Sequence, residues 1–298
     1  MSQCASCGKG GDGLKICNGC KQVKYCNTTC QISHRPKHKQ KCKKRAAEIF
    51  DQALFKEPPP REDCPICFLR LPCSSLCNYQ TCCGKEICNG CVHSFIDLGA
   101  ETLDSSKTDC PFCREPCHDT DEEAIERIKK RLDVNPNNGE ALHFLAFNYL
   151  NGTMSLPQDT NKSFELWVRA AELGSVDACN SVANSYHHGR GVGKDKKKEN
   201  HYRQLAANGG HPIARYNLGW VEEDAGNMNR AVKHYMLAAG GGFDQAMAKI
   251  KEAFLKGFIT KDELRKTLQA YKDYQNDVKS DARDKAAAAI ASGGWEMM

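Results

Sequence analysis

The sequence predicts a mainly α-helical protein in which two small cysteine-rich modules precede an α-solenoid of stacked helix pairs. Three observations lead to this fold class. Of the 19 cysteines, all but Cys179 lie at or before Cys117. Most occur in pairs separated by two residues, the spacing at which two thiolates reach one tetrahedral metal ion. Beyond residue 119, a pattern of alanine, tyrosine and glycine recurs at the length of a helix pair.

The cysteine pairs favour zinc over disulfides. The N-terminus lacks an apolar run, so we expect no secretory signal, and the small-apolar run 286–291 is too short to span a membrane. We therefore expect an intracellular protein, in the cytoplasm, the nucleus or both, where cysteines stay reduced. Segments this short bury too little apolar surface to fold alone, and bound zinc would replace the missing core.

Residues 1–45 supply eight candidate ligands, enough for two closed tetrahedral sites without an open catalytic position. If the pairs alternate between the two ions, each ion joins parts of this short segment that are far apart in sequence. His38 and Cys42 are four residues apart, which places both on one face of a helix. We assign the ligands to two zinc ions, one held by Cys4, Cys7, Cys26 and Cys30 and the other by Cys17, Cys20, His38 and Cys42.

The couplings Tyr25-Cys26, Cys30-Gln31 and His38-Lys39 resemble the MYND zinc finger over residues 4–42. The resemblance implies a protein-interaction module that binds proline-rich peptides through a Gln and a Trp on its short helix. Gln31 occupies the first of these positions, but Arg35 replaces the Trp. A guanidinium stacks on rings yet offers a proline less apolar surface than an indole does.

The first module is strongly basic, with 11 Lys or Arg and the single acidic residue Asp12 in residues 1–45. No aromatic residue is interleaved with the basic run 37–45 to stack on a base, so we do not expect nucleic acid as a partner. The formal net charge of +5 counts cysteines as neutral thiols. About fifteen thiolates and four Zn²⁺ would together contribute −7 and bring the net charge to about −2.

Residues 46–63 are expected to form a linker. Residues 46–56 have the pattern of a short amphipathic helix. Pro58-Pro59-Pro60 would end this helix and form an extended spacer after it. We place a domain boundary at these prolines.

The second module, residues 64–117, opens with Cys64-Pro65-Ile66-Cys67 and closes with Cys110-Pro111-Phe112-Cys113-Arg114. Its spacing resembles the cross-brace of a RING finger. Lys85 stands where that family often has a histidine ligand, so the resemblance is to the all-cysteine variants, with adjacent Cys82 and Cys83 as ligands. The implied sets are Cys64, Cys67, Cys88 and Cys91 on one ion and Cys82, Cys83, Cys110 and Cys113 on the other. Alternatively Cys77 replaces one of the adjacent pair; Cys73, Cys77 and Cys117 are otherwise free thiols.

The RING resemblance implies a groove for a ubiquitin-conjugating enzyme, at positions that fall on Ile66, Phe95 (usually Trp) and Pro111. Arg114 follows the last cysteine, where active ligases carry a basic residue that hydrogen-bonds ubiquitin and the conjugating enzyme together. The alternative is that Ile66 and Phe95 only fill the small core and that Arg114 is solvated.

The segment 119–278 carries a helical repeat. Its four blocks begin at alanines that are 37, 36 and 32 residues apart, namely Ala141, Ala178, Ala214 and Ala246. Each of the first three blocks has a second helix with an alanine pair, followed by a turn that begins at Gly174, Gly209 or Gly240. Periods of this length mark stacked helix pairs whose small residues allow close approach.

The pattern Tyr-x-x-Gly and the loop Gly189-Arg190-Gly191-Val192 resemble Sel-one-like repeats, which are relatives of the tetratricopeptide repeat. The resemblance implies a surface that binds peptides or partner proteins. Residues 122–132 read as a leading cap helix, and Leu264, Leu268 and Tyr271 indicate a closing helix. We expect residues 279–298 to be a mobile tail and residues 194–198 a solvated loop.

Two functions are compatible with this organisation. No phosphate loop, nucleophile elbow, dinucleotide fingerprint or methyltransferase domain is visible, and the scattered histidines of the repeats lack convergent ligands. The first hypothesis is a RING-type ubiquitin ligase that binds a ubiquitin-conjugating enzyme and recruits substrate through the repeats. The alternative is a non-enzymatic scaffold whose three modules all bind proteins. Both require about four structural zinc ions per chain.

Overall fold

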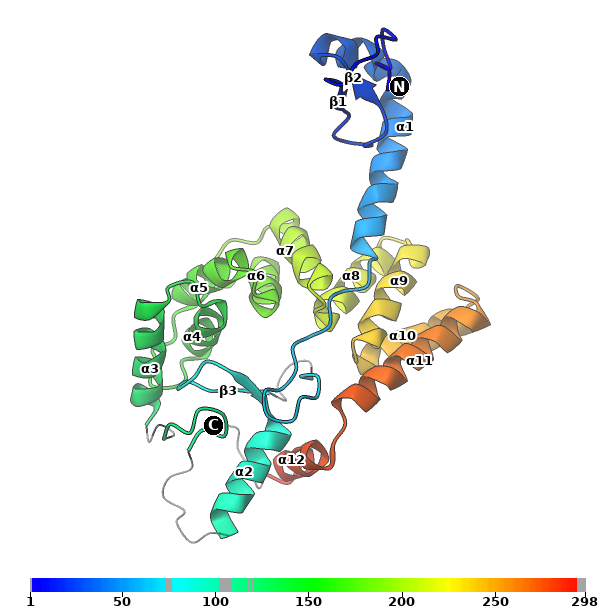
Figure 1. Cartoon of the computed structure of the whole chain (residues 1–298). Coiled ribbons are helices and arrows are strands. Elements are labelled where there is room, and N and C mark those ends of the chain that lie inside the picture. Colours follow the sequence, from blue (N-terminus) through cyan, green and yellow to red (C-terminus); the bar gives the residue numbers. More distant parts are fainter. Residues whose placement is uncertain (1, 73–76, 102–108, 117, 119, 294–298) are drawn as a thin grey trace. The chain divides into compact units, whose positions relative to one another are not determined.

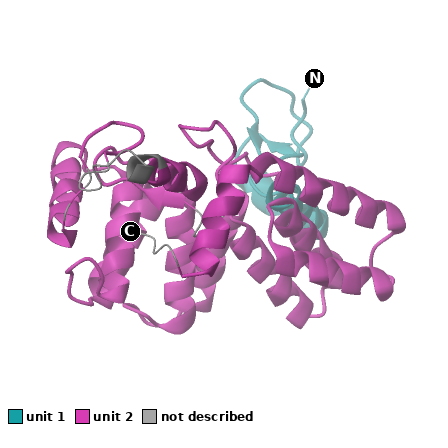
Figure 2. Ribbon diagram, turned by 90° about the horizontal axis from the view of Figure 1, so that it is seen from below, with its two compact units in different colours: residues 1–56 teal, residues 57–298 magenta. Residues whose placement is uncertain are grey.

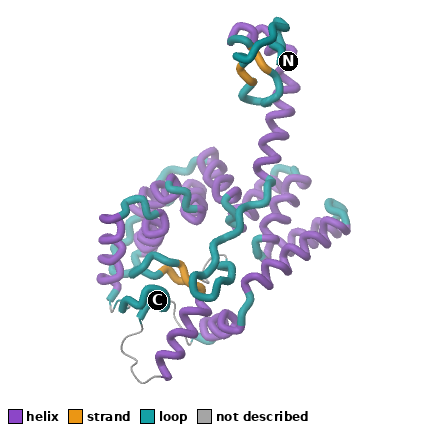
Figure 3. Tube along the Cα trace, viewed as in Figure 1, coloured by secondary structure: helices purple, strands orange, loops and turns teal. Residues whose placement is uncertain are grey.

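The computed structural model of the chain describes residues 2–72, 77–101, 109–116, 118 and 120–293. Cys73, Cys117 and Trp295 lie outside these ranges. The chain divides into two compact units, residues 1–56 and 57–298 (Figure 2). Helices dominate the described residues and strands are few and short (Figure 3). None of the helices in these ranges combines the length and the apolar character needed to cross a bilayer.

The first unit is a small two-stranded sheet with one long helix. Strands β1 (Lys15–Ile16) and β2 (Lys24–Tyr25) pair antiparallel. Helix α1 (Thr28–Leu54) begins where the Asn27 side chain accepts a hydrogen bond from the Cys30 amide. The separate helix predicted to start at residue 46 is wrong, because α1 runs without a break through residues 43–48, which are good helix formers.

The second unit begins with a hairpin and a helix. Strand β3 (Cys77–Tyr79) pairs antiparallel with β4 (Glu86–Cys88), and α2 (Asn89–Glu101) follows directly. The next nine helices lie one after another in the array drawn in Figure 1. They are α3 (Asp121–Val134), α4 (Gly139–Asn151), α5 (Thr160–Glu172), α6 (Val176–His188), α7 (Lys196–Asn208), α8 (Pro212–Asp224), α9 (Met228–Gly240), α10 (Asp244–Leu255) and α11 (Lys261–Val278).

Small buried residues explain the close packing of these helix pairs. The four alanines that open the repeat blocks, and one alanine of each pair in the second helices, are fully buried. They are Ala141, Ala178, Ala214 and Ala246, with Ala170, Ala206 and Ala238. The predicted helical solenoid is confirmed, with α3 as the leading helix and α11 as the closing helix.

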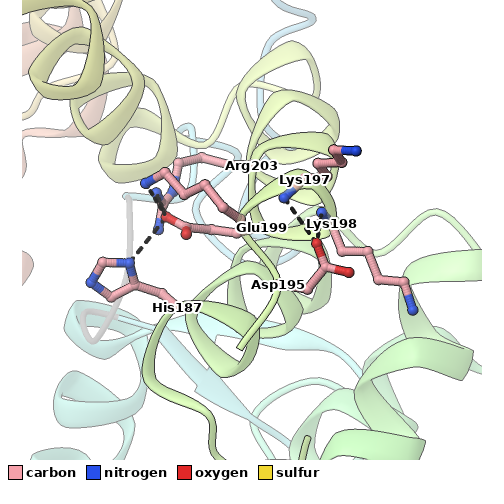
Figure 4. Close-up of polar contacts among 7 residues, drawn as sticks. His187, Asp195, Lys197, Lys198, Glu199 and Arg203 are labelled. Carbon is pink, nitrogen blue, oxygen red and sulfur yellow. Dashed lines mark hydrogen bonds and ion pairs between the residues drawn. The ribbon is translucent and has the colours of Figure 1, made fainter. Parts of the chain in front are cut away.

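Figure 4 shows how the start of α7 is fixed. Asp195 caps this helix by accepting hydrogen bonds from the amides of Lys197 and Lys198. Residues 196–198 therefore belong to a helix rather than to the predicted loop. One turn further, the buried carboxylate of Glu199 pairs with Arg203 and lies 3.1 Å from Nδ1 of His187. This histidine thus has an ionic partner, and the described histidines of the repeats form no metal cluster.

The predicted mobile tail is wrong for residues 281–291, which form helix α12 (Asp281–Ala291). Ser280 caps this helix, and its buried Ala286 belongs to an alanine-rich run that favours helix. Helix α12 packs against α2 so closely that a Cβ on Gly90 would lie 2.7 Å from Arg283. Arg283 donates to the carbonyl oxygens of Arg70 at 2.8 Å and Leu69 at 3.3 Å.

We predict that Arg283→Ala loosens α12 by about 2 kcal/mol, because charge-assisted hydrogen bonds to two backbone carbonyls are lost. Hydrogen–deuterium exchange of the α12 amides measures this local opening. The matched control is Lys285→Ala, since Lys285 is exposed on the same helix. Equal protection of α12 in the two variants would show that Arg283 does not hold the helix.

Candidate metal centres

The sixteen ligand candidates come together in four sets, and each set matches the assignment made from the sequence. Within each set the ligand atoms all lie within 4.8 Å of one another. In the first unit the sets are Cys4, Cys7, Cys26 and Cys30, and Cys17, Cys20, His38 and Cys42. In the second unit they are Cys64, Cys67, Cys88 and Cys91, and Cys82, Cys83, Cys110 and Cys113.

The distances between ligand atoms fit a tetrahedral zinc ion. With Zn–S bonds of about 2.3 Å, two sulfurs on one ion are about 3.8 Å apart, whereas a disulfide requires about 2.05 Å. Sulfur pairs from all four sets lie close to the first value. The separations are 3.6 Å for Cys7–Cys26, 3.7 Å for Cys17–Cys42, 3.8 Å for Cys67–Cys88 and 3.9 Å for Cys83–Cys110.

The same backbone turn presents the two ligands of four of the five Cys-x-x-Cys pairs, the exception being Cys88–Cys91 at the start of α2. The residue after the second cysteine has positive φ, and its amide donates to the carbonyl of the first cysteine at 2.9 Å. Four residues occupy this position, namely Gly8 (φ 74°), Lys21 (φ 55°), Phe68 (φ 57°) and Arg114 (φ 61°). Left-handed backbone is costly for residues other than glycine. The turn is therefore held in place by the rest of the site.

Hydrogen bonds within these turns favour the thiolate form that zinc requires. The backbone N–H of Cys7 hydrogen-bonds the Cys4 sulfur, and that of Cys20 the Cys17 sulfur, which lowers the pKa of both thiols to about 6. In the second unit a hydrogen bond from the Cys88 side chain lowers the pKa of Cys64 to about 4. A donor that stabilises the charged form shifts the pKa in this direction. Side-chain hydrogen bonds and burial raise the pKa of other thiols in these sets, to about 12 for Cys26 and to about 11 for Cys42. The suitability for zinc therefore rests on the sulfur and imidazole donors and on their separations.

Cys77 does not take part in the adjacent-cysteine site. It lies in β3 and donates to the Pro72 carbonyl, and burial raises the pKa of its thiol to about 12. Among the described residues, the set of nearby ligand atoms therefore contains Cys82 and Cys83 and not Cys77. Lys85 is exposed; its backbone N–H hydrogen-bonds the Cys83 sulfur, and its carbonyl accepts from the Gln80 amide at 2.9 Å.

Two supporting arginines were missed by sequence reasoning. The guanidinium of Arg131, from α3, donates to the Cys82 carbonyl and lies against Gly84, where a Cβ would be 3.0 Å away. Arg283, from α12, reaches within 3.5 Å of the Cys67 sulfur. These contacts tie each centre of the second module to the helical array. Their sequence separations leave no local signal that could have predicted them.

The first module has one further support. His34 is partly buried and is hydrogen-bonded through Nδ1 to the Tyr25 hydroxyl at 3.0 Å. Its ring stacks on that of the ligand candidate His38, with centroids 5.6 Å apart. Such neighbours orient a metal-binding histidine. Gln31 and Arg35 are both exposed on α1, one turn apart, as the MYND resemblance requires.

The groove positions of the second module are brought together only in part. Phe95 and Pro111 line one cavity of about 70 Å³, together with Phe144 and Met154 from the helical array. Ile66 is not among the residues of this cavity and packs on the small core around Leu71. Arg114 is exposed. Phe95 and Pro111 thus lie together, whereas Ile66 packs on the small core.

Comparison with known proteins supports two of the three resemblances directly. Residues 4–42 match the model of the MYND finger, and residues 139–175 and 176–211 each match that of the Sel1 repeat. A Sel1 repeat protein from Oxalobacter formigenes is 28% identical in sequence, with a TM-score of 0.39 over 43% of this chain and 97% of that structure. The protective antigen c5321 of uropathogenic Escherichia coli is 20% identical, with a TM-score of 0.45 over 59% and 38% of the two chains.

The similar curated proteins are ubiquitin ligases. Over 70 residues the chain is 37% identical to E3 ubiquitin-protein ligase GW2 of Oryza sativa subsp. indica, and it matches the protein of subsp. japonica equally well. The match covers 24% of this chain and 15% of the relative, so the chain spans only a small part of the relatives' length. Zinc-finger modules joined to Sel1 repeats form a protein-interaction architecture.

We predict that Cys83→Ser lowers the zinc content from about four to about three ions per chain, because a tetrahedral structural site needs all four ligands. Cys77→Ser should leave the content unchanged, although this neighbouring cysteine is also shielded from solvent. Elemental analysis of the purified protein measures both values. Equal zinc loss in the two variants would contradict the assignment.

We predict that Gly8→Ala destabilises the first unit by about 1 kcal/mol, because alanine must adopt positive φ there. Gly13→Ala is the matched control. A Cβ at either glycine meets no atom within 4 Å, and only Gly8 has positive φ. Zinc competition with a chelator measures the difference, and equal chelator sensitivity would show that the turn geometry contributes nothing.

Proposed function

We propose that this chain is a zinc-stabilised ubiquitin ligase of the RING type. In this proposal residues 64–117 bind a ubiquitin-conjugating enzyme, the repeats recruit the substrate protein, and the MYND finger binds a further peptide. The observation that carries the proposal is the cross-braced pair of tetrads that presents Phe95, Pro111 and the exposed Arg114. The partial similarity to a named ubiquitin ligase supports it.

The proposed chemistry uses no residue of this chain as a nucleophile. All four centres have complete sets of protein ligands, so zinc would hold the fold and leave no position for a substrate. The second module would bind the conjugating enzyme, and the Arg114 guanidinium would donate hydrogen bonds that fix the thioester-linked ubiquitin. A substrate lysine then attacks the thioester, and the thiol of the conjugating enzyme leaves. Positioning of this kind lowers the entropic cost of the transfer.

We also propose that the protein resides in the cytoplasm or the nucleus, because the fifteen cysteines of the four sets would have to stay reduced to bind zinc. The chain would carry about four zinc ions there.

A non-enzymatic scaffold is the second candidate, and one observation favours it. Phe144 and Met154 of the array share the cavity of Phe95 and Pro111, so the array covers part of the surface that a conjugating enzyme would need. In that case the second module would serve only to join the other parts.

We predict that Arg114→Ala lowers autoubiquitination about tenfold, the loss expected for one charge-assisted hydrogen bond. Lys21→Ala is the matched control, because Lys21 is also a basic residue in the left-handed turn position of a zinc pair. The assay uses the purified full chain with a panel of ubiquitin-conjugating enzymes.

Absence of ubiquitin transfer with every conjugating enzyme, from protein that carries its full zinc content, would refute the ligase and favour the scaffold. Equal activity of the two variants would mean that Arg114 has no part in the transfer.

A further inference from the structure

The segment 57–61 that follows α1 contacts the helical array through Pro58 and Arg61, whereas its other residues are exposed. Residues 57–61 have the sequence Glu-Pro-Pro-Pro-Arg and no regular secondary structure. They belong to the same compact unit as the array, and Figure 1 shows the segment passing α8 on its way to β3. Pro58 is partly buried, and its Cβ would lie 3.2 Å from a Cβ on Gly210.

The segment runs along the glycine turns that join one repeat to the next. Two cavities flank it, one of about 520 Å³ and one of about 530 Å³. Together they are lined by all three turns of the repeat pattern, at Gly174, Gly209–Gly210 and Gly240–Gly241. The repeats therefore present equivalent turns in a row, with the chain's own prolines across them.

The first cavity is suited to prolines. Its wall includes Met236 and Leu237 from α9 and Ala270 and Tyr274 from α11. A run of prolines adopts an extended, preformed helix without amide donors, and it binds through ring contacts with apolar and aromatic side chains. Pro58 and its neighbours line this cavity without filling its 520 Å³.

The second cavity is suited to basic side chains. Arg61 reaches into it and lies 3.5 Å from the carboxylate of Asp177, whose other oxygen is 3.4 Å from Nε2 of His211. Glu140 and Glu86 line the same space. Burial, reinforced by the charges of Glu86 and Asp177, raises the pKa of Glu140 to about 7. The carboxylates that line this space outnumber its two cations, Arg61 and Lys85, so a further cation at this point would be stabilised.

The chain's own segment is a poor match at one position. Glu62 follows Arg61 and lines the acidic cavity, where its charge adds to the repulsion on Glu140 and Glu86. A basic residue at the corresponding position of another peptide would replace this repulsion by attraction.

We propose that the row of repeat turns is a docking groove for an extended partner peptide in which consecutive prolines precede basic residues, and that residues 57–61 are its intramolecular competitor. This proposal rests on the proposed function, because it names the class of partner that the repeats would recruit. It is tested by a binding measurement. Peptide binding can therefore be absent while ligase activity is present, and it can be found in a chain that transfers no ubiquitin.

The probe is a labelled synthetic peptide that reproduces residues 56–62 with lysine in place of the final glutamate. Its binding to the zinc-loaded full chain is followed by fluorescence anisotropy. A tethered competitor has an effective concentration in the millimolar range, so the unsubstituted chain should bind the peptide weakly. Arg61→Ala weakens the competitor and should tighten peptide binding about threefold or more, as expected for a partly exposed ion pair.

Substitution in the groove should act in the opposite direction. In the Arg61→Ala background, Asp177→Asn should weaken peptide binding about threefold or more. Glu172→Gln is the matched control, because Glu172 is an exposed acid at the end of α5 and does not line the cavity. Glu62→Lys in the chain improves the competitor and should also weaken peptide binding.

Hydrogen exchange of the unsubstituted chain provides a second readout that needs no variant. Saturating peptide should accelerate exchange at the amides of Glu57 and Arg61, because the competitor is released. No saturable binding at about millimolar peptide, or equal effects of Asp177→Asn and Glu172→Gln, would overturn the proposal. Binding that is lost in Gln31→Ala but not in Asp177→Asn would place the peptide on the MYND finger, and this too would overturn it.

Discussion

Cross-bracing by sulfur tetrads is the constraint on which both cysteine modules depend. Cys4 and Cys7 meet Cys26 and Cys30, and the second set of each module interleaves with the first. The buried residues of the first module are mostly the ligands themselves, with Tyr25 at the centre. An ion bound in each set would therefore fix chain segments that no apolar core could hold, and its loss would free a loop as well as a ligand.

The second module depends on the array as well as on metal. Arg131 binds the carbonyl of the ligand candidate Cys82, and Tyr79 of β3 packs on Phe144 with ring centroids 5.0 Å apart. At the other centre, Arg283 donates to the carbonyls of Leu69 and Arg70, which follow Cys67. The module is thus held between α3 and α4 at one centre and α12 at the other. A chain with independent modules would not need charged side chains at both of these contacts.

The features that the sequence could predict are those with a local or periodic signal. Two residues between cysteines determine a shared ion, and the recurring alanines determine stacked helix pairs, since both follow from spacing alone. The pairing of Cys82 with Cys83 also followed from one substitution, Lys85 in place of a histidine. The continuity of α1 and the docking of α12 were not predicted. Both depend on tertiary contacts that the local sequence does not encode. Arg283, for example, binds a carbonyl more than two hundred residues away along the chain.

The contacts between the second module and the repeats bear on both candidate functions. Arg131, Tyr79 and Arg283 join the module to the helical array, so a partner bound along the repeat turns would lie in the same compact unit as the candidate zinc centres. For a ligase, this placement raises the effective concentration of a substrate lysine only if that lysine lies within reach. For a scaffold, the same contacts would bring two partners together. Phe144 and Met154 cover the cavity at Phe95 and Pro111, so ligase activity would require these two side chains to move. A scaffold function requires no such movement.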